Sequence, residues 1–252
     1  MSKIMAHRGA RNLWAENSLL GFRNTAKLGF EAVEFDLHLT DAGEVVVIHD
    51  ALLQRTTTGT GPVRQLTAQA RQELRLKGPD GALIPEGVPT LDDVLAIFAP
   101  HPETKLYVEL KADENGRPYP GLTAKAAEIL RAHGLQSRSV LHSFDIAVVR
   151  EIRDLAPDFG RLISVNQEWC DRQGGIAAFL AEVEDLVDIV GIHHELFEAE
   201  YEQITSLRAK ERCSVWTINT PELMRRWIDR APGYLVSDNP VMLREILQES
   251  VG

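Results

Sequence analysis

The sequence predicts an α/β protein of the (β/α)8 barrel class, and three observations lead to this prediction. Apolar segments typical of strands alternate with amphipathic segments typical of helices along the whole chain. Eight such strand segments fit into 252 residues, which is the usual size of a TIM barrel. No Gly-x-Gly-x-x-Gly pattern follows the first strand, so a doubly wound nucleotide-binding sheet remains only the alternative.

The eight strands are expected where short apolar runs are bounded by turn residues. They cover residues 3–7, 32–39, 105–110, 138–143, 160–165, 187–193, 213–218 and 233–237. Helices are expected at 17–29 and 122–134, because apolar residues there recur at helical spacing and each segment ends at a glycine. Another helix is expected to begin at Thr220-Pro221, a favourable N-cap followed by proline in the first turn.

One additional strand, 44–49, interrupts the alternation. A turn with Gly43 in the left-handed position should join it to the second strand as a hairpin. The expected register brings His49 opposite Phe35, and therefore close to the carboxylates on either side of Phe35.

The segment 51–90 differs in composition from the rest, because it is rich in threonine, glycine and proline. We interpret it as an insertion after the second strand, within a single barrel domain that spans residues 1–252. Because it begins just after His49, we expect it to cover the barrel mouth as a partial lid.

Composition excludes several functional classes. A net charge of −10 without a basic cluster argues against nucleic acid as a partner. No stretch approaches the ~20 apolar residues of a membrane helix, and the N-terminus lacks a signal-peptide pattern. Cys170 and Cys213 are too few and too far apart for a disulfide framework or a zinc site. We therefore expect a cytoplasmic protein without stable membrane insertion, whose oligomeric state the sequence does not indicate.

Carboxylates gather at two of the predicted strands. Glu34 and Asp36 share one face of the second strand, and Glu109 lies on the next strand of the barrel. Three carboxylates at ~4–6 Å cannot all stay ionised without a cation between them. Because all-oxygen ligation suits hard ions, we expect a divalent metal, Mg²⁺ or Ca²⁺, rather than zinc.

Basic residues accompany these carboxylates. Arg8 and Lys111 would provide fixed positive charges beside the metal, which suits a phosphate ester. Cleavage of a phosphodiester requires a base for the attacking oxygen and an acid for the departing alkoxide. His7 and His49 are the side chains best suited to this near neutral pH.

Each of these residues also has a plain structural explanation. His7 or His49 alone could be a structural histidine, and Glu109 with Lys111 could be a simple salt bridge. Glu34 with Asp36 could likewise belong to an ion pair at the closed end of the barrel. Their joint occurrence at one rim favours a site.

Other residues near strand ends remain open. His142, His193 and His194 are equally compatible with structural and functional roles. Trp216 fits core or rim packing, with an aromatic wall for a substrate as the alternative, and Cys213 fits a packed strand position.

With these motifs in order, the chain resembles the glycerophosphodiester phosphodiesterase family over nearly its whole length. The matching motifs are His7-Arg8-Gly9, Glu16-Asn17-Ser18, Glu34-Phe35-Asp36, Leu39-Thr40 with Asp41-Ala42-Gly43, His49-Asp50, Leu53 with Arg55-Thr56-Thr57, Pro89-Thr90-Leu91, Glu109-Leu110-Lys111, Ser143-Phe144, Trp216-Thr217-Ile218-Asn219 and Ser237-Asp238-Asn239-Pro240.

The resemblance implies metal-dependent hydrolysis of glycerophosphodiesters to sn-glycerol 3-phosphate and an alcohol such as choline or ethanolamine. By the same resemblance, His7 and His49 correspond to the acid/base pair; Glu34, Asp36 and Glu109 to the metal ligands; Arg8 and Lys111 to the phosphate contacts; Glu16 and Asn17 to residues that line or brace the site; and Trp216 to an aromatic residue near the substrate.

Departures from the family pattern are few. His142 stands where a small polar residue is expected, Ala15 replaces a frequent proline, and Ser18 and Ser237 replace frequent threonines. Because His142 is expected near the site, it could shift the substrate preference or the pH optimum.

Two alternative functions remain. The same chemistry could act on lysophospholipids or glycerophosphoinositol, with Leu13 and Trp14 as the only hint of an apolar entrance. A catalytically silent barrel that binds phosphodiesters would be expected to lack a histidine or a ligand, and none is missing.

Overall fold

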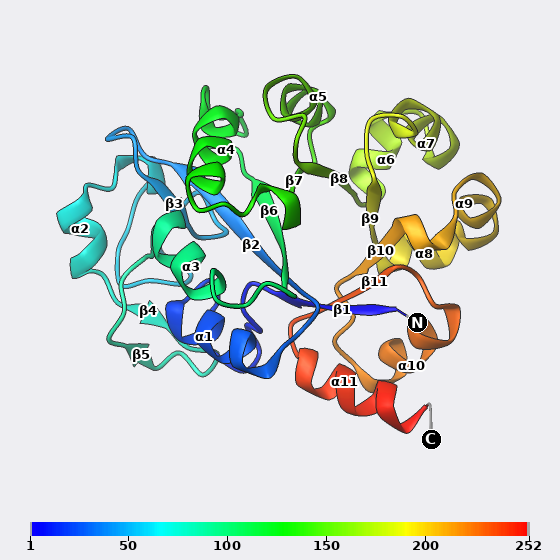
Figure 1. Ribbon diagram of the computed structural model, residues 1–252, viewed down its shortest axis with the longest axis horizontal. Helices are drawn as coiled ribbons and strands as arrows, with labels where there is room; N and C mark the ends of the chain where they lie inside the picture. Colours follow the sequence, from blue (N-terminus) through cyan, green and yellow to red (C-terminus); the bar gives the residue numbers. More distant parts are fainter. Residues whose placement is uncertain (1, 251–252) are drawn as a thin grey trace.

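The computed structural model describes residues 2–250, and eight parallel strands form a closed ring at its centre (Figure 1). The strands are β1 (Lys3–His7), β2 (Ala32–Leu39), β6 (Lys105–Leu110), β7 (Ser139–Ser143), β8 (Gly160–Val165), β9 (Ile189–His193), β10 (Cys213–Trp216) and β11 (Tyr234–Ser237). The ring closes because β1 pairs with β11 on one side and with β2 on the other. The (β/α)8 prediction is therefore confirmed, and the doubly wound alternative is excluded.

Helices surround the ring (Figure 1). They are α1 (Leu19–Leu28), α3 (Leu91–Phe98), α4 (Leu122–Ala132), α5 (Ile146–Leu155), α6 (Gln167–Arg172), α7 (Ile176–Val183), α8 (His194–Ala199), α9 (Tyr201–Leu207), α10 (Pro221–Arg230) and α11 (Pro240–Glu249). The predicted helix end at Gly29 and the predicted N-cap at Thr220 are found: Gly29 ends α1 at φ 66°, and Thr220 caps α10. Ser18, which was not predicted as a cap, caps α1 and accepts a hydrogen bond from the Gly21 N–H.

The predicted hairpin is confirmed, although its second strand is shorter than expected. β3 (Val45–Val47) pairs antiparallel with β2 outside the ring. The Ile48 N–H donates to the Asp36 carbonyl at 3.1 Å, as the expected register requires. His49 follows directly, and therefore reaches the rim beside the carboxylates of β2.

The segment between β3 and α3 holds only short elements: a 3₁₀ turn (Val63–Gln65), α2 (Ala68–Glu73), β4 (Leu76–Lys77) and β5 (Leu83–Ile84). A small apolar cluster that includes Val46, Leu53 and Leu76 packs this segment against the outer side of β3. No residue of 52–90 lines the cavity at the barrel mouth. The expected lid is therefore wrong, since the apolar contacts hold the segment beside the mouth rather than across it.

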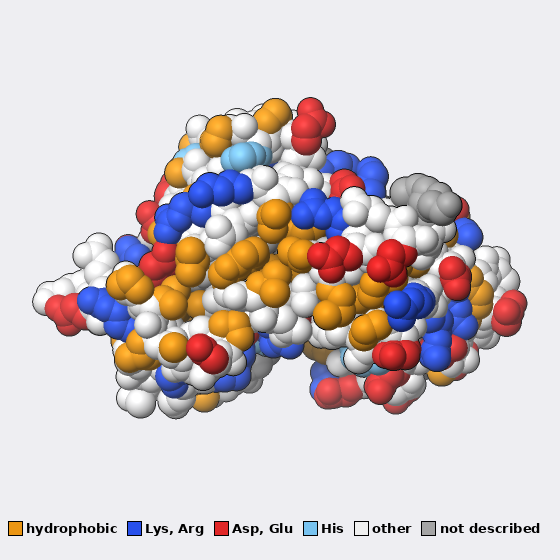
Figure 2. Space-filling model, turned by 90° about the horizontal axis from the view of Figure 1, so that it is seen from below, with side chains coloured by type: hydrophobic (Ala, Val, Ile, Leu, Met, Phe, Trp, Pro, Cys, Tyr) orange, Lys and Arg blue, Asp and Glu red, His pale blue; other side chains and the backbone are white. Residues whose placement is uncertain are grey.

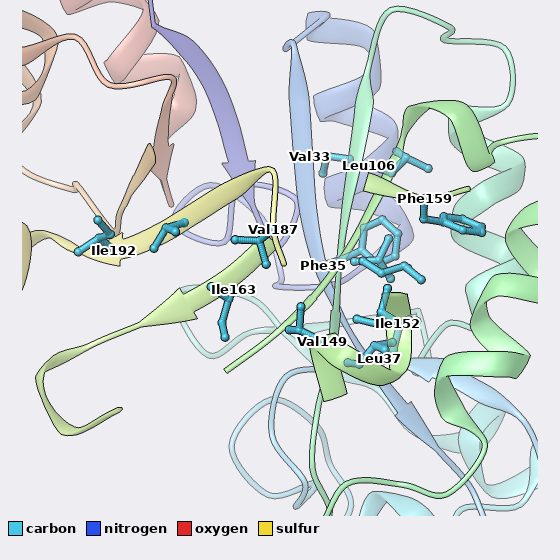
Figure 3. Packing of buried hydrophobic residues seen from close by; sticks show 14 of the residues in the cluster. Val33, Phe35, Leu37, Leu106, Val149, Ile152, Phe159, Ile163, Val187 and Ile192 are labelled. Atoms are coloured by element: carbon cyan, nitrogen blue, oxygen red, sulfur yellow. The ribbon is translucent and has the colours of Figure 1, made fainter. Parts of the chain in front are cut away.

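Alternation along β2 sorts its side chains between two environments. Val33, Phe35 and Leu37 face outward into the layer of helices, where Val149 and Ile152 of α5 belong to the same buried cluster (Figure 3). The residues between them face the barrel interior. The apolar packing of one face of β2 thus determines the direction of the carboxylates on the other.

The outer surface mixes charges of both signs. On the underside of the view in Figure 1, hydrophobic side chains lie between basic and acidic ones rather than beside one uniform charged patch (Figure 2). Within residues 2–250, no helix has both the length and the apolar character needed to cross a membrane.

Two positions on α5 test the packing of the helical layer. Ile152 is fully buried, whereas Leu155 is 48% exposed. Ile152→Ala should lower the free energy of unfolding by ~2–5 kcal/mol, because it removes buried methyl groups and leaves a cavity. Leu155→Ala is the matched control and should change it far less. Equal urea midpoints for the two variants would contradict this packing.

Candidate active site

A cavity of about 160 Å³ lies at the mouth of the barrel. Seven of the ten residues predicted for the site line it: His7, Arg8, Glu34, His49, Glu109, Lys111 and Trp216. Glu16, Asn17 and Asp36 are buried but are not part of its lining. The strand ends that the sequence singled out therefore converge on one site.

His7 is the last residue of β1, and a carboxylate holds its ring. Its Nδ1 lies 2.5 Å from Asp238, which follows β11, and its Nε2 lies 3.7 Å from Glu34. Burial and the Arg8 charge lower the pKa of His7, while Asp238 acts in the opposite direction. His7 is therefore an oriented, largely neutral imidazole with Nε2 on the side of Glu34.

The ring of His49, in the loop after β3, is held in the same way. Its Nδ1 lies 2.7 Å from Asp50, and the guanidinium of Arg55 binds both oxygens of Asp50. A carboxylate that binds one ring nitrogen fixes the ring's orientation and tautomer, which leaves the other nitrogen for proton transfer. Each of the two histidines predicted as acid and base thus has a ring held by a carboxylate.

Glu16 connects the two aspartates that hold the histidine rings, through one arginine on each side. Arg55 donates two hydrogen bonds to Glu16, at 2.8 and 2.7 Å. On the other side, Arg11 lies 3.7 Å from Glu16 and 2.8 Å from Asp238. Burial alone would raise the pKa of Glu16, but Arg55 and Arg8 lower it. Glu16 thus braces the site, and it does not line the cavity.

Asp238, Asp50, Arg11 and Arg55 contact the predicted site residues directly or through one another, and the sequence reasoning gave them no role. Asp50 and Asp238 were visible as carboxylates next to a motif or at a strand end. Their function depends on the side-chain contacts with the histidines, which sequence spacing does not reveal.

Asp36 lies deeper than its neighbours. It accepts a hydrogen bond from Asn17 at 2.8 Å and lies 3.4 Å from Arg8 and 3.3 Å from Lys111. Burial would raise its pKa, but Lys111 and Arg8 hold it well below its usual range. Asp36 is therefore an ionised counter-charge for the two basic residues.

Glu34, Glu109 and His142 form the group that could hold a metal ion, with one potential ligand atom from each within 4.8 Å of the others. Asp36, which was predicted as the third ligand, is not in this group. Both oxygens of Glu34 are buried and have no hydrogen-bond partner among residues 2–250. Burial, then Asp36 and Glu109, raise the pKa of Glu34 well above its usual range. Buried acidic oxygens without donors fit a cation.

Lys111 stands at the edge of this group. Its Nζ donates to Glu109 at 2.7 Å. Burial would lower the pKa of Lys111, but Glu109 and Asp36 raise it above its usual value. Since Lys111 also lines the cavity, it presents a permanent positive charge there, as Arg8 does.

An aromatic wall forms another side of the cavity. The Trp216 ring meets Phe144 edge to face at 5.5 Å, and meets His193 in the same way at 4.9 Å. His193 stacks on His194 at 4.5 Å, and neither lines the cavity. Cys213 is buried in β10, as expected. The alternative role of Trp216 as a cavity wall thus agrees with its position.

The sequence model of the Glycerophosphoryl diester phosphodiesterase family matches residues 7–242. The chain belongs to this family of phosphoric diester hydrolases.

Individual relatives agree with this assignment. A glycerophosphodiester phosphodiesterase of Caldanaerobacter subterraneus is 28% identical over 61% of this chain and 63% of its own length. A structure from Agrobacterium tumefaciens, assigned as a glycerophosphoryl diester phosphodiesterase, has a TM-score of 0.88 at 24% identity and covers 100% of this chain and 99% of its own. An Oleispira antarctica phosphodiesterase, solved with its product sn-glycerol-3-phosphate, has a TM-score of 0.79 at 23% identity over 98% and 97% of the two chains.

The contact between His7 and Asp238 can be tested by titration. The Asp238 carboxylate stabilises the protonated imidazolium, so removing its charge makes protonation harder. Asp238→Asn should therefore lower the pKa of His7 further, as measured by NMR titration of the ring in the metal-free protein. Asp92→Asn, beside the distant His133, is the control and should leave His7 unchanged. An unchanged or raised pKa of His7 in Asp238→Asn would contradict the contact.

Proposed function

We propose that the protein hydrolyses glycerophosphodiesters to sn-glycerol 3-phosphate and an alcohol, with His7 and His49 as general acid and base. The observation that carries the proposal is that the two histidines are held in the same way. Each ring is held at Nδ1 by a carboxylate, and both line one cavity with Arg8 and Lys111. A phosphodiester placed there would have two oriented imidazoles and two fixed cations around it.

A divalent metal completes this site in the proposal. Glu34 and Glu109 would hold it, together with a third ligand from Asp36 or His142. The two carboxylates suit Mg²⁺ or Ca²⁺. When bound, the ion supplies positive charge that neutralises the phosphate and stabilises its transition state.

The remaining residues would bind the substrate or hold other site residues in place. Arg8 and Lys111 would contact the phosphate oxygens, and the buried charge of Asp36 keeps both cations in place through its ion pairs. Glu16 and Asn17 act through other residues, since Glu16 binds Arg55 and Asn17 donates to Asp36. Trp216 would pack against the carbon atoms of the glycerol.

Proton transfer falls to the two histidines. One accepts the proton of the attacking oxygen, and the other donates a proton to the departing alkoxide, which leaves as the free alcohol. Asp238 and Asp50 stabilise whichever ring becomes charged, as the carboxylate does in a catalytic triad.

A product assay tests this function. The protein should release glycerol 3-phosphate from glycerophosphocholine and glycerophosphoethanolamine, and the rates over a panel that adds glycerophosphoinositol and lysophospholipids would rank the leaving alcohols. Leu13 and Trp14, the hint of a lipid entrance, are partly buried and do not line the cavity. Release from none of these compounds would overturn the proposal.

Removing either imidazole should affect turnover strongly. His7→Ala and His49→Ala should each lower kcat for glycerophosphocholine by roughly 10²–10⁴-fold, the usual contribution of a positioned acid or base. His133→Ala is the matched control, because this histidine lies outside the barrel and contacts Asp92. Nearly full activity of either variant would remove that histidine from the acid/base role.

Metal removal should abolish turnover. Without a cation, burial and the neighbouring carboxylates favour protonation of Glu34, and the phosphate loses part of its counter-charge. Dialysis against a chelator should stop glycerol 3-phosphate release, and added divalent ion should restore it. A rate that chelation leaves unchanged would show that Glu34 and Glu109 do not act through a metal.

A further inference from the structure

We propose that His142 is a metal ligand, which gives the centre a nitrogen donor and makes it prefer transition ions such as Co²⁺ or Zn²⁺ to Ca²⁺. The proposal rests on the proposed function, because it concerns the metal of the same site. It differs from the expectation from the sequence, in which all three ligands were carboxylates.

The fold directs His142 into the site. It lies on β7 in register with Glu109 of β6. Val140, two residues earlier on the same strand, belongs to the apolar cluster that includes Met5 and Tyr107 inside the barrel. Because alternate residues of a strand share a face, His142 points to the interior one layer nearer the mouth, where it lines the cavity.

The ring of His142 has no hydrogen-bond partner among the described residues. The residue is 4% exposed, and both ring nitrogens are buried without a donor or acceptor in contact. A buried polar group without a hydrogen-bond partner lowers the stability of the folded state, and such groups are rare in native proteins. A ligand on the nitrogen would remove this cost.

Another buried histidine shows what a purely structural role looks like here. In His38, Nδ1 lies 2.9 Å from the Tyr119 hydroxyl and Nε2 lies 3.0 Å from the His49 carbonyl. His38 is buried like His142, yet both of its nitrogens are occupied. The empty nitrogens of His142 therefore do not follow from burial in this fold.

The distance to Glu34 suits a shared ion. The Nε2 of His142 lies 3.9 Å from Glu34 Oε1, too far for a hydrogen bond. Two donors that each bind one ion at ~2.1 Å lie at most ~4.2 Å apart, twice the bond length. Both atoms can thus reach one ion without rearrangement of the barrel.

The chemical type of the ligand atoms determines which metal ion the site prefers. Carboxylate oxygens alone suit Mg²⁺ and Ca²⁺, whereas imidazole suits later first-row ions and zinc. Two glutamates and one histidine form a mixed set, which binds Co²⁺ or Zn²⁺ more tightly than an all-oxygen site does. A serine or threonine at position 142 would not provide this nitrogen.

The test measures metal binding directly, so that it does not depend on turnover. The metal-free full-length protein is titrated with Co²⁺ and, separately, with Ca²⁺ by calorimetry. The variants are His142→Ser, which removes the ring and keeps a small polar group, and His142→Gln, which keeps more of the volume. His133→Ser, at the residue that follows α4, is the control. Thermal unfolding verifies that each variant is folded.

Both His142 variants should weaken Co²⁺ binding by at least the roughly 10–100-fold that loss of an outer hydrogen-bond partner of a ligand costs. Ca²⁺ binding should change much less, and His133→Ser should change neither. With Mn²⁺ bound, pulsed EPR should show nitrogen coupling in the wild type that disappears in His142→Gln.

Three results would overturn the proposal. The first is a wild-type protein that binds no Co²⁺, and the second is a folded His142 variant that binds Co²⁺ as tightly as the wild type. The third is nitrogen coupling that persists in His142→Gln but is lost in His7→Ser, which would assign the nitrogen to the other ring. Binding that depends on His142 in a protein that cleaves no glycerophosphodiester would refute the proposed function alone.

Discussion

The site depends on how the barrel compensates the carboxylates that it buries at its mouth. Asp36 is matched by Arg8 and Lys111, and stays ionised because of them. Glu34 has no such partner within residues 2–250, and its pKa rises instead. This unequal division of positive charge distinguishes Asp36, which pairs with two basic residues, from Glu34, whose oxygens have no hydrogen-bond partner. The basic residues therefore organise the acidic ones, in addition to the phosphate contacts that the proposed function gives them.

A second set of ion pairs organises the histidines. His7 ends β1 and His49 lies in the loop after β3, yet their supporting aspartates connect through arginines to the same carboxylate, Glu16. Neither ring is positioned by its own strand alone. The relative orientation of the two is a property of this network, and Glu16 is its centre.

The alternation of eight strand segments with helical segments made the barrel predictable, and period-two alternation in β2 made its inward carboxylates predictable. The turn at Gly43 gave the hairpin register. The lid prediction failed because sequence position says where a segment begins, whereas the apolar contacts of Leu53 and Leu76 decide where it packs. Asp36 was expected among the metal ligands because it lies two residues after Glu34 and therefore shares its face of β2. The difference between them lies in which cations they meet, and this depends on contacts between strands distant in sequence.

Arg55 gives the segment after β3 an influence beyond its own packing. Arg55 belongs to a peripheral stretch with few regular elements. Its guanidinium nevertheless binds both Asp50, the residue after His49, and Glu16, which precedes α1. Local fraying of that stretch would release His49 while the ring of strands stays closed. The orientation of His49, which the proposed acid/base role requires, therefore depends on the packing of this peripheral stretch as well as on the barrel core.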